Sequence, residues 1–156
     1  MSAPMPQRFK DLMRRSKRDW DASRVAVAIL RADSKVAQVL ERALAEVDLT
    51  LPQFNVLMEL ASSPEGSLPL YGLTQRLTST PPNTSWLTTR MEEAGFVRKE
   101  RSTSDTRVVL VKLTNRGWTK LGAAAPVVFA AEKELLGGFG REDLRRLSRL
   151  LGELLM

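Results

Sequence analysis

The sequence contains no cysteine and no histidine among its 156 residues. Without cysteine, disulfides, thiolate catalysis and cysteine-based redox sensing are excluded, and the composition fits a reducing compartment. Without histidine, the commonest general base and the commonest metal ligand are both missing. The acidic residues do not follow the spacing of a calcium-binding loop. We therefore expect no metal, no cofactor and no enzymatic activity.

Long apolar segments are also missing. No run approaches the ~20 residues that a membrane span requires, and residues 1–20 lack the apolar region of a signal peptide. We therefore expect a cytoplasmic protein without a membrane partner.

What the sequence does have is basic charge: 24 Lys and Arg against 18 Asp and Glu, a net charge of +6. Basic surface favours a polyanionic partner, because binding releases counterions from phosphates.

The first half of the chain has the periodicity of helices. Phe9, Leu12, Met13 and Trp20 predict a short amphipathic helix whose other face is basic. Apolar residues at near-helical spacing then predict a long helix over about 23–47. Thr50 and Gln53 have the spacing of a capping box, with a proline in the first turn, which predicts a helix over 51–62.

The middle of the chain predicts two short helices followed by a hairpin. We expect a helix over about 69–77, a turn at 78–82, and a second helix that runs to Ala94 with Gly95 as its C-terminal cap. Residues 96–100 and 108–113 read as two strands, and 101–107 as the polar tip between them.

The C-terminal part predicts two more helices. One begins at 114 and is kinked at Pro126, and the glycines at 137, 138 and 140 end it. The last has a leucine seam for packing against another helix, formed by Leu144, Leu147, Leu151 and Leu154. The fold class is thus mainly α (α+β): a winged helix-turn-helix with a two-stranded β wing and an α-helical dimerisation domain from both termini.

This arrangement points to duplex DNA. The second helix of the pair fits a major groove, where exposed side chains reach base edges. By helical spacing Thr84, Leu87, Thr88 and Met91 face inward, and the other side is rich in Asn, Ser, Thr and Arg. Trp86 stands out, and two roles stay open for it: contact with thymine methyls or sugars, or an internal contact. The candidate DNA contacts in this helix are Asn83, Thr84, Ser85, Trp86, Thr89 and Arg90.

The hairpin from Arg98 to Lys112 has five basic and two acidic residues, a net charge of +3. Such a wing can lie along the DNA backbone or insert an arginine into the minor groove. A solvated hairpin is the alternative. The candidate contacts here are Arg101, Asp105 and Arg107.

The residues from Leu49 to Gly117 resemble the MarR (multiple antibiotic resistance regulator) family. The anchors are Leu49-Thr50-x-Pro52-Gln53-Phe54, Met91-Glu92-x-x-Gly95-Phe96-Val97 and Ser104-Asp105-Thr106-Arg107-x-x-x-Val111-x-Leu113-Thr114-x-x-Gly117. The resemblance implies that Asp105 and Arg107 shape the wing and touch DNA. Thr106 replaces the family's usual basic residue, which implies a wing that binds less tightly.

The resemblance also implies an organisation and an effector. Residues 1–48 and 115–156 would form the dimerisation helices, and 49–114 the DNA-binding lobe. Many relatives respond to a small aromatic or phenolic molecule between these lobes. Candidates to line such a site are Trp20, Arg24, Phe54 and Met58, with ordinary core packing as the alternative for each.

Together these observations predict a homodimeric transcriptional regulator, a repressor that binds a pseudo-palindromic operator in double-stranded DNA and is released by a small aromatic or phenolic ligand. The alternative is a basic helical interaction or RNA-binding module without sequence-specific DNA binding. An enzyme is disfavoured because no Ser-His-Asp set, phosphate loop or dinucleotide motif is present.

Overall fold

A computed structural model describes residues 6–8, 10–11, 20–77 and 80–155, and its contacts divide the chain into two units, residues 1–36 and 37–156. In the first unit, residues 7, 8, 10 and 11 are helical, and Trp20 begins helix α2 (Trp20–Ala45). The prediction that Trp20 ends a shorter helix is therefore wrong. Asp21 lies in the first turn of α2, where its charge is favourable beside the helix N-terminus. The rest of that predicted helix falls mostly outside the described residues.

Helix α3 (Leu51–Ala61) lies at the centre of the second unit and contacts α4, α5, α6 and the sheet. Its start is the capping box that the sequence predicts: the Gln53 backbone N–H donates to Thr50 Oγ1 at 3.4 Å, and the Thr50 N–H donates to Gln53 Oε1 at 3.0 Å. Val56, Leu57 and Leu60 are fully buried. This spacing places the apolar stripe of α3 in the core.

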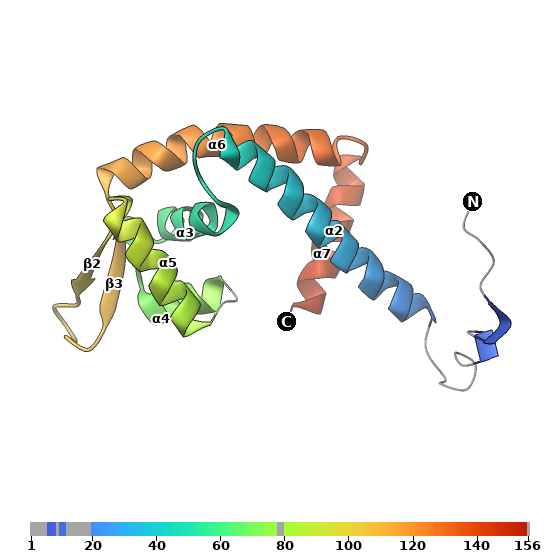
Figure 1. Ribbon diagram of the computed structural model, residues 1–156, viewed down its shortest axis with the longest axis horizontal. Coiled ribbons are helices and arrows are strands. Elements are labelled where there is room, and N and C mark those ends of the chain that lie inside the picture. Colours follow the sequence, from blue (N-terminus) through green and yellow to red (C-terminus); the bar gives the residue numbers. More distant parts are fainter. Residues whose placement is uncertain (1–5, 9, 12–19, 78–79, 156) are drawn as a thin grey trace. The chain divides into compact units, whose positions relative to one another are not determined.

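Helices α4 (Leu70–Arg76) and α5 (Pro81–Glu93) form the helix-turn-helix, and they lie against each other in Figure 1. In α4, Leu73 is fully buried. In α5, Thr84, Thr88 and Met91 are buried and Leu87 packs against the core. The inward face predicted for the second helix is thus confirmed.

The sheet has three strands in the order β1-β3-β2, all antiparallel. Figure 1 shows β2 and β3 side by side. Strands β2 (Val97–Arg101) and β3 (Val109–Leu113) are the predicted hairpin. Strand β1 (Ser67–Pro69) was not predicted, because three residues are too few to show an alternating pattern. Its buried Leu68 lies opposite Val111. Pro69 has no N–H to donate, which is tolerated on an edge strand.

Four elements meet at the Phe96 carbonyl. After α5, Gly95 has φ +76°, and the Phe96 N–H donates to the Met91 carbonyl at 2.9 Å, so α5 ends in a Schellman motif. The Thr114 N–H donates to the Phe96 carbonyl at 3.2 Å. The Thr114 hydroxyl donates to the Gly95 carbonyl at 2.7 Å and lies 3.1 Å from the Phe96 carbonyl, and Thr114 Oγ1 accepts from the Gly117 N–H. The end of α5, the start of β2, the end of β3 and the start of the next helix are therefore held together.

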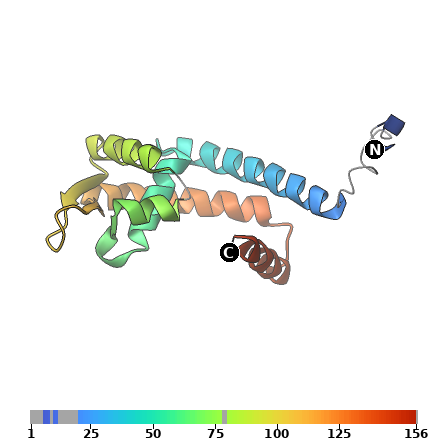
Figure 2. The same cartoon turned by 90° about the horizontal axis from the view of Figure 1, so that it is seen from below.

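Helices α6 (Asn115–Leu136) and α7 (Arg141–Leu154) complete the unit, as the second view shows (Figure 2). Helix α6 continues through Pro126 as one helix. The carbonyl that loses its partner belongs to the exposed Gly122, where water can replace the missing N–H. Helix α7 has no buried residue: Leu144 is half-buried, and its other leucines are exposed. Among the described residues, no helix is long and apolar enough to cross a membrane.

Gly117→Ala tests the junction at Phe96. A Cβ on Gly117 would overlap the Phe96 carbonyl oxygen, which is backbone and cannot turn aside. We expect the free energy of unfolding to fall by at least ~1–3 kcal/mol, as in overpacked cores, measured by urea unfolding. The control is Gly122→Ala in the same helix, where a Cβ meets nothing within 4 Å. There alanine should be neutral or stabilising, by up to ~1 kcal/mol. Equal effects of the two substitutions would contradict the prediction.

Candidate nucleic-acid interface

Helix α5 presents a polar and aromatic face away from the core. Asn83, Trp86, Thr89 and Arg90 are exposed, and Ser85 is half-buried. Thr84 is different: its side chain is only 1% exposed, and its hydroxyl donates to the Thr80 carbonyl at 3.2 Å. Its inclusion among the DNA contacts is therefore wrong, because residues spaced by four on a helix share a face, and Thr84 shares the buried face with Thr88.

Trp86 lies outside the core of the second unit, with 67% of its surface exposed. The Arg90 guanidinium carbon is 6.0 Å from the centre of the indole ring, which is at the outer limit of a cation–π contact. Arg90 also lies 3.7 Å from the Glu93 carboxylate, in an exposed ion pair. Exposed ion pairs contribute little to stability. The side chains of Trp86 and Arg90 can therefore leave these contacts at little cost and bind a partner molecule.

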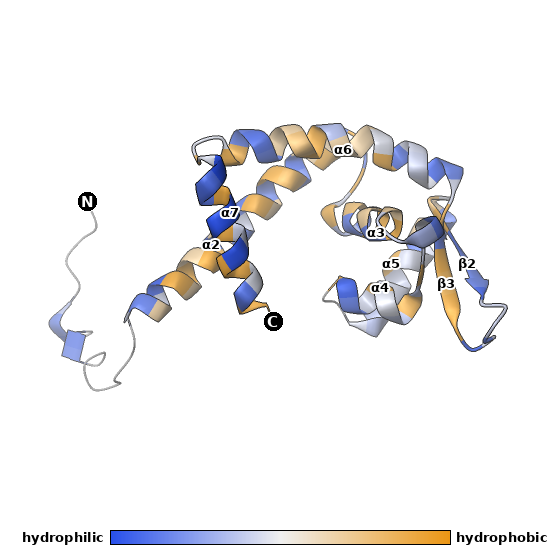
Figure 3. Ribbon diagram, turned by 180° about the vertical axis from the view of Figure 1, so that it is seen from behind, coloured by the Kyte–Doolittle hydropathy of each residue, from blue (hydrophilic) through white to orange (hydrophobic). Residues whose placement is uncertain are grey.

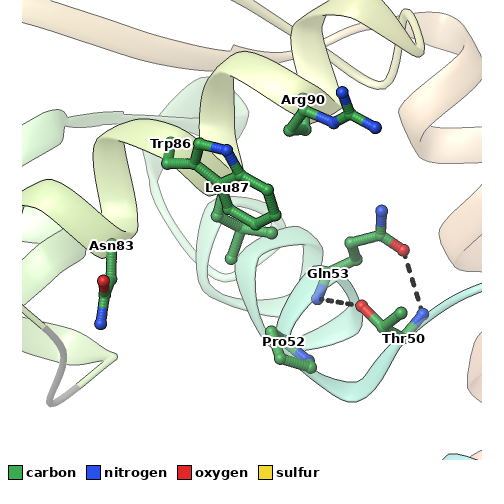
Figure 4. A pocket seen from close by; sticks show the side chains of 7 residues that line it. All are labelled: Thr50, Pro52, Gln53, Asn83, Trp86, Leu87 and Arg90. Carbon is green, nitrogen blue, oxygen red and sulfur yellow. Dashed lines mark hydrogen bonds between the residues drawn. The ribbon is translucent and has the colours of Figure 1, made fainter.

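A pocket of about 580 Å³ lies beside this face. Figure 4 shows Trp86 and Leu87 projecting from α5 toward the N-terminus of α3. The pocket is lined by Thr50, Pro52, Gln53, Asn83, Trp86, Leu87 and Arg90. Sequence reasoning did not find it, because its walls come from segments more than 25 residues apart whose contact depends on the packing of α3 against α5.

Lys99 on β2 is a second feature that sequence reasoning missed. Its Nζ donates to Thr89 Oγ1 at 2.6 Å and to the Ser85 carbonyl at 3.3 Å. Its backbone N–H donates to Glu92 Oε1 at 2.6 Å. The sequence shows Lys99 only as one of five basic wing residues. The structure turns its ammonium toward the recognition helix instead of outward along the wing.

The wing tip is shaped by side-chain contacts to its own backbone. Asp105 Oδ1 accepts from the Arg107 N–H at 3.0 Å and from Arg107 Nε at 3.4 Å. Aspartate often organises a turn in this way. Arg101 Nη1 donates to the Thr106 carbonyl at 2.7 Å across the hairpin. The Arg107 side chain is 92% exposed, so its charge points into solvent.

The remaining charges of the sheet are partly compensated. Arg98 Nε lies 3.3 Å from the Glu100 carboxylate, and Lys112 Nζ lies 3.7 Å from that of Glu65. Arg107 is compensated in the same way by Asp105, at 3.4 Å, whereas Arg101 donates to the neutral Thr106 carbonyl and keeps its charge at the tip. Within the described part of the chain, no group of three or more acidic side chains could hold a metal ion.

The four residues predicted for an effector fall in both units. Trp20 and Arg24 lie on the part of α2 that belongs to the first unit, and both are exposed. Phe54 is a buried core residue, 6% exposed, and Met58 packs against the same core. Phe54 and Met58 thus have a packing role in the second unit, and a ligand role for any of the four stays a prediction.

The helix-turn-helix followed by a β wing defines a winged-helix DNA-binding protein. The MarR family model matches residues 49–109. The transcriptional regulator HosA of Escherichia coli is 31% identical over 108 residues, which are 69% of this chain and 78% of HosA. The chain belongs to the MarR family. It is a DNA-binding transcriptional regulator and not an enzyme.

Solved structures share the fold. The transcriptional repressor CouR, bound to a 23-mer DNA duplex, has a TM-score of 0.76 and 28% identity, over 83% of this chain and 90% of CouR. An organohalide-sensing transcriptional regulator in its 2,4-dichlorophenol-bound form has a TM-score of 0.79 and 20% identity, over 99% of this chain and 86% of that one. The predicted fold class is confirmed by this likeness and by the helices and sheet described above.

Arg107→Ala should weaken DNA binding for all sequences alike, because a phosphate contact does not depend on the base. The slope of log affinity against log salt should decrease by about 1. Fluorescence anisotropy with several duplexes over a salt series measures both effects. Asn83→Ala is the matched variant on α5, and it should change base preference and leave the salt slope nearly unchanged. Circular dichroism checks that both variants fold. An unchanged affinity of a folded Arg107→Ala variant would contradict the wing's role.

Proposed function

We propose that this protein is a homodimeric repressor that binds a pseudo-palindromic operator and is released by a small aromatic or phenolic ligand. The observation that carries the proposal is the two-sided recognition helix α5. Its buried residues hold it on the core, while Asn83, Trp86, Thr89 and Arg90 are exposed together. Amide, hydroxyl and guanidinium groups are those that read base edges in the major groove.

The wing supplies the sequence-independent part of the binding. In our proposal α5 enters the major groove, and Arg107 and Arg101 reach the backbone or the adjacent minor groove. Asp105 acts indirectly, because its contact with the Arg107 backbone N–H shapes the turn. Half or more of the hydrogen bonds in protein–DNA complexes go to phosphate and sugar. A positive wing beside a reading helix provides both kinds of contact.

The dimer is supported by the apolar side chains that α7 leaves uncovered. Leu147, Leu151 and Leu154 are 43%, 37% and 66% exposed and recur at helical spacing. Figure 3 shows apolar residues along α7 alternating with strongly hydrophilic ones. An apolar helical seam of this kind is buried by a second helix. Two recognition helices about 34–36 Å apart would then enter successive major grooves. The three-part division into residues 1–48, 49–114 and 115–156 belongs to this proposal.

Repression and release follow from the same geometry. A dimer on an operator blocks access to the DNA, and the fold is shared with the repressor CouR. The pocket beside α5 offers Trp86, Leu87 and Pro52 as apolar walls and Arg90 as a cation, which suits an aromatic ring with an acidic group. A ligand there would occupy side chains that we assign to DNA. The same fold holds 2,4-dichlorophenol in the organohalide-sensing regulator.

Binding to the protein's own upstream DNA tests the proposal. Affinity for this duplex should exceed that for random DNA by about 10³-fold or more at physiological salt, and should fall steeply as salt rises. Footprinting should show two half-sites about one helical turn apart. Salicylate and 2,4-dichlorophenol, added as probes, should release the complex. Equal affinity for both DNAs would favour the alternative, a basic interaction or RNA-binding module.

Leu151→Glu should break the dimer, because it places a charge in the apolar seam of α7. Sedimentation velocity should show a monomer at concentrations where the unchanged protein is a dimer. DNA affinity should fall in parallel, since each monomer then binds a single half-site without the help of a second monomer. Leu155→Glu is the control: Leu155 is 87% exposed, follows the end of α7 and lies outside the predicted seam. A dimeric Leu151→Glu variant would show that the seam is not the interface.

A further inference from the structure

Lys99 and Thr89 form a hydrogen-bonded brace between the wing and the reading face of α5, which is the exposed face formed by Asn83, Trp86, Thr89 and Arg90. Lys99 Nζ lies 2.6 Å from Thr89 Oγ1 and 3.3 Å from the Ser85 carbonyl. Thr89 Oγ1 lies 2.9 Å from the same Ser85 carbonyl. Thr89 is exposed, whereas Lys99 is half-buried. The ammonium group of a half-buried lysine thus contacts the hydroxyl of an exposed threonine.

The protons and lone pairs of this group can be assigned. A threonine hydroxyl has one proton and two lone pairs, and a lysine ammonium has donors only. The Thr89 proton goes to the Ser85 carbonyl, since that carbonyl can only accept. One lone pair of Oγ1 accepts from Lys99 Nζ. What is left on Thr89 Oγ1 is a single lone pair, so this hydroxyl can accept one further hydrogen bond.

We infer that Lys99 is a positioning residue that makes Thr89 a hydrogen-bond acceptor toward the bases, and that Thr89 therefore selects a base with an exposed amino group. In the major groove the amino groups are N6 of adenine and N4 of cytosine, whereas guanine and thymine present acceptors. The inference rests on the proposed function, because it needs α5 to lie in the major groove. Beyond that function, it assigns Thr89 as the acceptor and the base as the donor in one hydrogen bond, and it names Lys99 as the wing residue that sets this direction.

The backbone of Lys99 makes a second contact with α5, which fixes the orientation of β2 relative to the helix. Its N–H donates to Glu92 Oε1 at 2.6 Å, one turn further along α5 than Thr89. Two contacts from one residue of β2 thus reach two successive turns of the same helix. A lysine that only provided charge would extend into solvent, as Arg107 does with 92% of its side chain exposed. Lys99 instead directs its charge at a neutral hydroxyl and a carbonyl.

The test uses the full-length protein and the duplex that it selects from a random pool. Each adenine of the selected site is replaced in turn by purine, and each cytosine by pyrimidin-2-one, which removes only the exocyclic amino group. We expect one position in each half-site where this change lowers affinity about three- to tenfold, the range of one hydrogen bond, and where Thr89→Val abolishes the difference. Thr89→Ser keeps the hydroxyl and should keep the difference.

Lys99→Met then separates positioning from charge. It should lower affinity for all duplexes through the lost charge, and should also shrink the amino-group effect at the Thr89 position, because the hydroxyl is freed to rotate and donate. Lys112→Met is the matched control: it removes the same charge from the same sheet, but Lys112 contacts Glu65 and not α5. This control should lower affinity and leave the amino-group effect intact.

Three results would overturn the inference. One is a base pair at which Thr89→Val lowers affinity but removal of the pair's amino group does not, since Thr89 would then donate to a base acceptor. Another is an amino-group effect that Thr89→Val does not alter. The third is an effect of full size in Lys99→Met, which would remove Lys99 from the mechanism. If the unchanged protein selects no sequence at all, the proposed function itself fails, and that outcome is recognised before any variant is made.

Discussion

The Phe96 carbonyl is the point on which the DNA-binding half of this protein depends. It accepts a hydrogen bond from the Thr114 N–H and shares the Thr114 hydroxyl proton with the nearer Gly95 carbonyl, and Gly117 lies directly against it. Only a residue without a Cβ allows that approach. Because the Schellman motif of α5 ends at Phe96 and β2 begins at Val97, this contact fixes the exit of the recognition helix relative to the wing and to α6. A buried carbonyl with several donors is a rigid joint, since leaving it unpaired would cost about 1–3 kcal/mol.

The buried face of α5 determines which of its residues form the reading face. Thr84 and Thr88 bury hydroxyls in the core, and each donates to a carbonyl one turn earlier, Thr80 or Thr84. Their hydroxyls are therefore satisfied within α5 and its N-cap. Met91 is fully buried on the same face of the helix. Once these residues are buried, the helix cannot rotate about its axis, and the exposed residues keep one orientation toward solvent.

The local signals in the sequence were sufficient for most of the secondary structure. The capping box at Thr50, the cap at Gly95 and the two strands of the hairpin all depend on residues within about five positions of one another, and the structure confirms each. Three points about the elements and their buried faces were wrong or missed. Strand β1 exists only because β3 pairs with it. Trp20 joins α2 instead of an earlier helix. Thr84 was counted as a DNA contact although its helical position places it in the core.

The sequence by itself determined the family, the helix-turn-helix and the charged wing, because those follow from short-range spacing, capping and composition. The absence of cysteine and histidine likewise excluded disulfides, thiolate catalysis and histidine-based catalysis or metal binding without reference to any fold. Only the tertiary structure decided which polar residues face outward, brought Trp86 and Arg90 to the N-terminus of α3, and turned Lys99 toward Thr89. Those contacts join residues distant in the chain. Their geometry depends on how helices pack, and packing is set by the whole core instead of by any local pattern.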